Sequence, residues 1–409
     1  MKYALSAMNS IVVSFSYALR MLLARPGVAL LNALLIALGV ATMTVLLLVS
    51  TQMERSISRD LADVDVVVGA KGSPLQMILA GVLHVDVPAG NIPLAAAQEL
   101  AKDSRVKQLI PLSLGDSYEG FRIVGTTLAY PALYGANLKA GAMWVQPMQA
   151  VAGADVSERL PLGAVFAGSH GLGGGGELHD KSTYQVVGHL ERCGCVLDRL
   201  ILTSTESVWQ VHEKEIALDE ADKKALQDER EITFALIQYA SPLAAVSFPR
   251  FVNTSTELQA AAPAVEITRL FRMLGVGTQV LQAFAAVLLA VAAISLWMAI
   301  TQALRERRGD LAMLRMLGAS PGKVASLLLF ETVLLALAGW AMGVLLGHLL
   351  TSVIGYLLVQ ERSLVISGAL VLKEELLVLA GVFILSVLAV AWPLRQAYKL
   401  DVLKQLQMR

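Results

Sequence analysis

The sequence has few charged residues and few cysteines. Asp, Glu, Lys and Arg make up 16% of its 409 residues, whereas soluble proteins average about a quarter. Acidic and basic residues balance at 33 each, so the chain lacks the basic excess with which nucleic-acid-binding proteins neutralise phosphates. Two cysteines are too few for a disulfide framework. These shortages argue against soluble, nucleic-acid-binding and disulfide-rich proteins.

Hydrophobic residues are abundant instead, at 56% of the chain, which excludes a disordered protein. Four runs almost free of charge exceed or approach the length of about 20 residues that crosses a bilayer. We predict transmembrane helices at 27–50, 275–304, 324–360 and 376–394. The first run is longer than the hydrophobic region of a signal peptide, and no convincing cleavage site follows it, so we expect a retained anchor.

The distribution of Lys and Arg predicts the orientation. An amphipathic N-terminal segment (1–26), the loop 305–323 and the tail 395–409 hold twelve basic and three acidic residues, whereas the loop 361–375 holds two and three. Because Lys and Arg mark cytoplasmic segments, both termini are predicted inside. Segment 51–274, with 19 basic and 26 acidic residues, is then periplasmic. We expect a multi-pass protein of the inner (plasma) membrane.

Segment 51–274 reads as a large mixed α+β domain on stalk helices between the first two spans. Its ends, 51–62 and 256–274, have helical spacing and continue those spans. Between them, apolar stretches predict strands and polar periodic ones predict helices. The predicted strands are 64–69, 121–130, 184–190, 199–204 and 232–239, and the predicted helices are 93–103 and 219–230. The apolar stretch 68–93 is either a partner surface or a buried strand and helix.

The most specific pattern runs from Arg305 to Leu350, RERRGDLAMLRMLGASPGKVASLLLFETVLLALAGWAMGVLLGHLL. An arginine-rich turn, a short helix ending in LGAS and a Glu on a Gly-rich span resemble the signature of the MacB/FtsX family of ABC transporter permeases. This type VII architecture also includes the lipoprotein-releasing permeases LolC and LolE. The order of one span, a large exported domain and three spans is similar as well.

The resemblance implies a coupling helix that docks on a separate cytoplasmic ABC ATP-binding subunit. The matching residues are Glu306, Arg307, Arg308, Leu311, Leu314, Arg315, Leu317 and Gly318. The alternative is that these arginines only set topology and solvate a loop. The resemblance further implies a homodimer or a heterodimer with a similar permease, and mechanotransmission from the ATPase to the periplasmic domain. Gly and Ala in the third span, as in AGWAMG, predict close packing at the dimer seam.

The chain has no nucleotide-binding motif of its own. A P-loop reads G-x-x-x-x-G-K-[ST], whereas GASPGKV at 318–324 is one residue short and ends in Val. No nucleophile elbow accompanies a Ser/His/Asp set either. We therefore expect a non-catalytic subunit that binds no cofactor, with ATP and magnesium held by the partner.

Two polar residues lie within the third predicted span. Glu331 is a functional candidate because a charge in the membrane is costly; the structural alternative is that it reaches water or an arginine near the cytoplasmic interface. His348 is expected to form a hydrogen bond with a neighbouring helix.

Most histidines and both cysteines gather in one part of the periplasmic segment: His170, His179, His189, Cys193, Cys195 and His212. Imidazole and thiolate together suit zinc or copper. Their spacing fits no structural zinc motif, since C-x-C is not C-x-x-C. Cys193 and Cys195 therefore ligate a metal, form a small disulfide, or line a loop that turns at Gly194.

Taken together, the sequence predicts a permease subunit that exports, extracts or handles a substrate at the outer face of the membrane. A lipid-linked, hydrophobic or peptide cargo and a metal are the candidate substrates, and a periplasmic adaptor, lipoprotein or substrate-binding protein is a further candidate partner. One alternative is a regulator that activates a periplasmic cell-wall hydrolase without transport. Another is zinc or copper handling through the His/Cys set.

Overall fold

The computed structural model divides into two compact units, each with its own contacts. The helical unit comprises Met1–Met53 and Gly275–Arg409, and the sheet unit comprises Glu54–Leu274. The structure describes residues 15–20, 22–24, 26–61, 63–171, 178–216, 226–227, 229–306, 313, 316, 318, 320–360 and 366–398.

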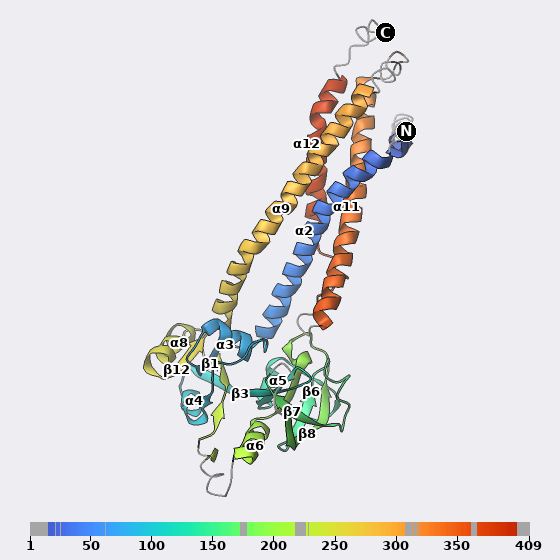
Figure 1. The fold of residues 1–409 in the computed structure, drawn as a ribbon. Coiled ribbons are helices and arrows are strands. Elements are labelled where there is room, and N and C mark those ends of the chain that lie inside the picture. The colour runs from blue at the N-terminus through green and yellow to red at the C-terminus, as the bar shows by residue number, and fades with distance from the viewer. Residues whose placement is uncertain are drawn as a thin grey trace, which may run out of the picture. The chain divides into compact units, whose positions relative to one another are not determined.

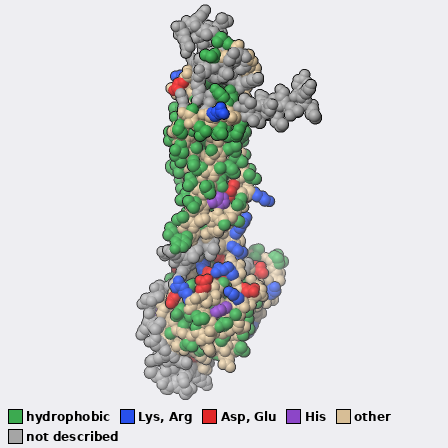
Figure 2. Space-filling view, turned by 90° about the vertical axis from the view of Figure 1, so that its right-hand side faces the viewer, with side chains coloured by type: hydrophobic (Ala, Val, Ile, Leu, Met, Phe, Trp, Pro, Cys, Tyr) green, Lys and Arg blue, Asp and Glu red, His purple; other side chains and the backbone are tan. Residues whose placement is uncertain are grey.

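Long apolar helices make up the helical unit (Figure 1). They are α2 (Pro26–Leu61), α9 (Pro263–Glu306), α11 (Pro321–Gln360) and α12 (Glu375–Tyr398). Each contains a stretch long and apolar enough to cross a membrane, and each predicted span lies within one of them. A helix suits such sequences because it satisfies every backbone hydrogen bond internally. Hydrophobic side chains cover the surface along these helices, whereas charged side chains gather on the sheet unit (Figure 2).

Three glycines at four-residue spacing bring α11 into close contact with α2. A Cβ atom built on each would lie 2.6–2.7 Å from the Cβ atom of an α2 residue. The pairs are Gly339 with Ile36, Gly343 with Val40, and Gly347 with Thr44. Small residues at this spacing allow helices in a membrane to approach closely. The glycines of AGWAMG, which we predicted at a dimer seam, thus pack against a helix of the same chain.

The sheet unit contains one mixed sheet with ten described strands. Its hydrogen-bonded order is β12-β1-β11-β3-β4-β9-β6-β8-β5, and β7 pairs with β3 and β8. The strands are β1 (Val66–Ala70), β3 (Val106–Tyr118), β4 (Phe121–Thr126), β5 (Leu138–Gly141), β6 (Gln149–Ala152), β7 (Val165–His170), β8 (Leu178–Leu190), β9 (Leu200–Ser204), β11 (Phe234–Tyr239) and β12 (Leu258–Ala261). A separate two-stranded sheet joins β2 (Ile92–Pro93) to β10 (Glu231–Ile232).

Short helices cover this sheet and close its cores. They are α3 (Pro74–Gly81), α4 (Leu94–Ala101), α5 (Ala129–Leu133), the 3₁₀ helix η1 (Val196–Arg199), α6 (Thr205–Ile216) and α8 (Ala244–Ser255). One core contains Val66, Ile237 and Phe248, and the other contains Ile123 and Ile201. The long strand β3 pairs with β11 in its first half and with β4 and β7 in its second half, so it joins the two cores.

The predicted strands overlap β1, β4, β8, β9 and β11, and the predicted helix 93–103 contains α4. The predicted helix 219–230 lies mostly outside the described residues. Within 256–274, the prediction of helix throughout is wrong, because Leu258–Ala261 form β12, an edge strand that pairs with β1. The apolar stretch 68–93 forms a buried strand and helix, in which Val68, Ile78 and Val82 are fully buried.

Candidate functional site

The chain passes from one unit to the other within α2 and within α9, and these two helices connect to neighbouring strands. α2 ends at Leu61 and β1 begins at Val66. On the return, β12 ends at Ala261 and α9 begins at Pro263. β1 and β12 are antiparallel neighbours, with Val67 opposite Ala261. Both helices are thus attached to one pair of hydrogen-bonded strands by very short connections.

The last turn of α2 is also held by side chains of the sheet unit. The Tyr134 hydroxyl donates a hydrogen bond to the Asp60 carbonyl oxygen at 2.9 Å. Gly194 packs so closely on α2 that a Cβ atom there would lie 2.7 Å from an Arg59 guanidinium nitrogen. With its positive φ of 64°, Gly194 adopts a backbone conformation that favours glycine.

Gly194 lies between the two cysteines, which form a disulfide. The Asp198 carboxylate accepts hydrogen bonds from the Cys193 and Gly194 backbone amides at 2.9 and 2.8 Å. Burial raises the pKa of Asp198, although these amide bonds lower it. Because a disulfide offers no thiolate, the prediction of Cys193 and Cys195 as metal ligands is wrong, and the disulfide alternative is confirmed.

Most of the predicted coupling helix lies outside the described residues, including Arg307, Arg308, Leu311, Leu314, Arg315 and Leu317. Glu306 is the last residue of α9, where its carboxylate accepts a hydrogen bond from the Gln302 amide at 2.8 Å. Gly318 has a φ of +93°, a conformation that glycine tolerates and other residues rarely adopt. The LGAS pattern therefore places a glycine where the backbone requires one.

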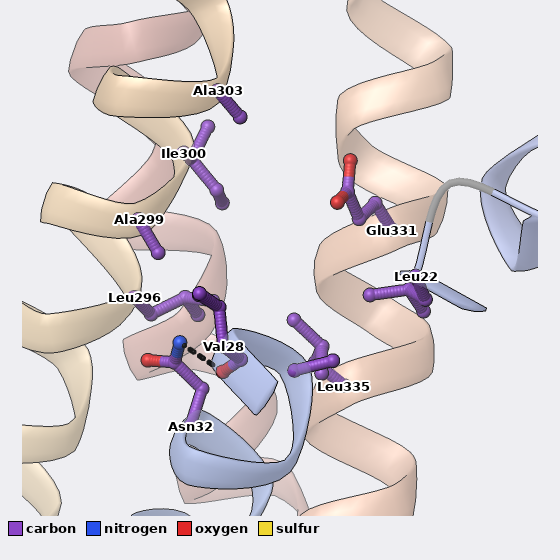
Figure 3. A pocket seen from close by; sticks show the side chains of 10 residues that line it. Leu22, Val28, Asn32, Leu296, Ala299, Ile300, Ala303, Glu331 and Leu335 are labelled. Carbon is purple, nitrogen blue, oxygen red and sulfur yellow. Dashed lines mark hydrogen bonds between the residues drawn. The ribbon is translucent and has the colours of Figure 1, made fainter. Parts of the chain in front are cut away.

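Glu331 lines a pocket between α2, α9 and α11 in the helical unit (Figure 3). Its carboxylate turns from α11 toward Ile300 and Ala303 of α9. Asn32 lines the same pocket and donates to the Val28 carbonyl oxygen of its own helix at 2.9 Å. The other lining side chains are apolar, so Glu331 and Asn32 are the polar groups that line an otherwise apolar pocket.

His348 lies farther along α11 and joins it to the segment before α12. Its Nδ1 atom forms a hydrogen bond with the Gly368 carbonyl oxygen, and its Nε2 atom lies 3.3 Å from the Glu375 carboxylate. Glu375 is the first residue of α12 and also accepts a hydrogen bond from the Leu372 backbone amide at 3.0 Å. His348 thus connects two neighbouring helices at one end.

The structure brings three of the predicted ligands together and separates the others. The ligand atoms of His170, His179 and His212 all lie within 4.8 Å of one another. His189 lies apart from this group, and its Nε2 atom forms a hydrogen bond with the Leu160 carbonyl oxygen at 2.8 Å. A fourth group, which sequence reasoning missed, is Asp116 of β3. Its carboxylate oxygens lie 3.2, 3.3 and 3.8 Å from nitrogens of His170, His179 and His212.

Strand pairing places Asp116 beside the histidines. Asp116 is directly opposite His170 in the β3–β7 ladder. The pairing of β3 with β4 is irregular between Leu114 and Ser117, and such irregularities redirect side chains. Nothing in the spacing of the sequence links Asp116 to His170, because the pairing joins strands that are distant along the chain.

Comparison with known proteins gives two family matches that together extend over most of the chain. The FtsX-like permease C-terminal model matches residues 283–402, and the MacB-like periplasmic core domain model matches residues 29–247, more than half of the chain. A search of curated proteins found no match.

Two solved structures resemble part of the chain. The periplasmic region of MacB from Actinobacillus actinomycetemcomitans is 12% identical to this chain, with a TM-score of 0.35. The aligned part covers 52% of this chain and 94% of the MacB region. The extracellular domain of the ABC-type transporter YknZ from Gram-positive bacteria is 13% identical, with a TM-score of 0.30. The aligned part covers 48% of this chain and 98% of the YknZ domain.

Proposed function

Because this chain belongs to the MacB/FtsX-like family of ABC transporter permeases, we propose that it couples ATP hydrolysis by a separate cytoplasmic subunit to movement of its sheet unit. In this proposal both termini are cytoplasmic and the sheet unit is periplasmic. The moving sheet unit handles a substrate at the outer face of the membrane. The observation that carries the proposal is the course of α2 and α9, which each run without interruption from the helical unit into the sheet unit.

The attachment of these helices supports transmission of movement. A helix keeps its length because every turn is fixed by backbone hydrogen bonds. The connections to β1 and β12 are too short to absorb a displacement, and the two strands are hydrogen-bonded to each other. Tyr134, and Gly194 between the two bonded cysteines, contact the last turns of α2. A tilt of either helix therefore displaces the strand that follows or precedes it.

The cytoplasmic end of the proposed pathway is the segment between α9 and α11. It contains Arg307, Arg308 and Arg315, which we assign to the contact with the ATP-binding subunit. Arginine suits this role because its guanidinium group makes two parallel hydrogen bonds to a carboxylate. Contacts there reach α9 directly, since α9 ends at Glu306.

The test is purification of the chain from its native membrane. An ABC ATP-binding subunit is expected to accompany it, and mass spectrometry identifies that subunit by its Walker A sequence. The double variant Arg308→Glu with Arg315→Glu is expected to weaken the association at least about tenfold, because it replaces attraction by repulsion at the contact.

Arg395→Glu provides the matched control, because Arg395 lies in the last turn of α12 at another basic segment predicted to be cytoplasmic. This variant is expected to retain the ATP-binding subunit. Equal retention by the double variant and the control would contradict the assignment of the coupling residues. Absence of any ATP-binding subunit from the wild-type preparation would contradict the proposed function itself.

A further inference from the structure

Four side chains from four different elements of the sheet unit converge on one point. Asp116 lies on β3, His170 ends β7, His179 is near the start of β8, and His212 is on α6; the four elements gather in one part of the sheet unit (Figure 1). We propose that these side chains bind one Zn²⁺ ion. This site is independent of the ATPase coupling proposed above.

The distances between the four groups fit a tetrahedral ion. Bonds of about 2.0–2.1 Å place neighbouring ligand atoms of tetrahedral Zn²⁺ about 3.3 Å apart. Asp116 Oδ1 lies 3.2 Å from His170 Nδ1 and 3.3 Å from His179 Nε2. His212 Nε2 lies 3.8 Å from Asp116 Oδ2. Small side-chain rotations therefore suffice to close the four groups on one ion.

The surroundings of Asp116 support a bound cation. Asp116 is only 3% exposed, and its ion-pair partners among the described residues are these three histidines, without a Lys or Arg. Its Oδ2 atom is buried and accepts no hydrogen bond from the residues that the structure describes. A buried carboxylate needs a compensating charge, and a divalent cation among neutral imidazoles supplies it.

The arrangement of the imidazole rings leaves the site accessible. His179 is 2% exposed and lies edge-on to His170 and His212, with interplanar angles of 79° and 88°. His170 and His212 are stacked with their centroids 5.4 Å apart, and their side chains are 46% and 35% exposed. Asp116 and His179 thus form the base of the site, and an ion reaches them between the two outer rings.

The donor set favours zinc over copper. Three imidazole nitrogens and one carboxylate oxygen are common zinc ligands, and a closed set of four is typical of tetrahedral Zn²⁺. Cu(II) prefers square-planar sites and Cu(I) prefers sulfur ligands, but the two cysteines are bonded to each other and supply no thiolates. The oxygen and nitrogen donors come from rigid strands and one helix, which hold the geometry before the ion binds.

The test is a Zn²⁺ titration of the full-length chain in detergent, purified without a polyhistidine tag and stripped with EDTA. A chromophoric chelator in competition reports the affinity and the stoichiometry. The wild type is expected to bind one Zn²⁺ per chain. His170→Ala and His212→Ala are each expected to weaken this binding at least about tenfold, because each removes one ligand. Both side chains are partly exposed, so the fold is expected to tolerate these substitutions.

His189→Ala is the matched control, since His189 lies on β8 with His179 but binds the Leu160 carbonyl oxygen instead. It is expected to bind Zn²⁺ as the wild type does. Substitution of Co²⁺ for Zn²⁺ is expected to give the intense visible absorption of tetrahedral cobalt, and Asp116→Asn to reduce it. Equal Zn²⁺ affinity in the wild type and in His170→Ala, or no stoichiometric binding by the wild type, would overturn the proposal.

Discussion

His84 is a buried histidine outside the three-histidine cluster. It is 7% exposed, has a φ of 54°, and forms a hydrogen bond through Nε2 with the Tyr130 hydroxyl at 2.8 Å. Burial lowers the pKa of its imidazole well below the ordinary value of 6.5, and the charges of Arg122 and Arg199 lower it further. The folded sheet unit therefore holds His84 neutral, whereas the unfolded chain protonates it below pH 6.5.

This difference predicts a loss of stability in mild acid. The contribution of His84 to the free energy of unfolding is complete above pH 6.5. It falls by about 1.4 kcal/mol for each pH unit below that value, until the pKa of His84 in the folded chain is reached. His84→Asn removes the titrating group while keeping a residue that tolerates positive φ. Thermal unfolding at about pH 7.5 and about pH 5 is expected to show a smaller acid shift for this variant than for the wild type.

His189→Asn is the control for this measurement, because it also replaces one histidine of the sheet unit by asparagine. It keeps His84 and is therefore expected to retain the acid shift that His84 causes. Equal acid shifts for the two variants would contradict a neutral, buried His84.

At single positions, the histidines of the proposed zinc site could be predicted from the sequence, but the complete ligand set could not. His170, His179 and His212 could be selected because they lie in one segment, whereas the rest of the chain contains few histidines. His189 and the two cysteines met the same criterion, although His189 lies ten residues beyond His179 along β8 and the cysteines are bonded to each other. Asp116 could not be selected, because its place opposite His170 comes from pairing of β3 with β7.

At the scale of elements, the membrane helices are the most predictable part of the fold. A run without charge has few alternatives to a helix that spans the membrane, and the predicted spans lie within α2, α9, α11 and α12. Strands were predictable where they are continuously apolar, as in β1 and β9. β3 contains Pro111, Gly115 and several polar residues, and β12 is rich in alanine, so pairing within the sheet decided both.

The seam between α2 and α11 gives a second prediction. Gly343→Leu is expected to destabilise the helical unit by about 1–3 kcal/mol, the usual effect of overpacking. The reason is that a Cβ atom at this position would lie 2.6 Å from the Val40 Cβ atom and 2.7 Å from the Ala37 carbonyl oxygen. The measurement is the midpoint of thermal unfolding of the chain in detergent.

Gly381→Leu is the matched control, since Gly381 lies within α12 and a Cβ atom there meets nothing within 4 Å. Leucine also favours the helix over glycine, so this variant is expected to be as stable as the wild type or more so. Similar unfolding midpoints for Gly343→Leu and Gly381→Leu would mean that the glycines do not set the seam.

At the scale of the whole molecule, the zero net charge is the sum of opposed parts. Basic residues dominate the segments predicted to be cytoplasmic, and acidic residues dominate residues 51–274. The basic segments suit a contact with the proposed ATP-binding subunit. α2 and α9 connect to neighbouring strands. Local sequence could not reveal this, because β1 and β12 lie near opposite ends of the sheet unit's sequence.

In the proposed function, ATP bound in the cytoplasm moves the sheet unit through α2 and α9. A flexible Gly-Gly-Ser insertion after Arg272, within α9, is expected to abolish that movement while the ATP-binding subunit still binds ATP. The same insertion after Ser241, in an exposed turn of the sheet unit, is expected to preserve it.

The most direct measurement is the distance between spin labels on Glu257→Cys in the sheet unit and Ala369→Cys in the helical unit. Both positions are exposed, and the native cysteines are disulfide-bonded, which leaves the introduced thiols for labelling. The complex with the ATP-binding subunit is compared without nucleotide and with ATP trapped by a hydrolysis-blocking substitution in that subunit. We predict that the distances, within one chain or to a second copy, shift between the two states; identical distance distributions despite bound ATP would contradict the account.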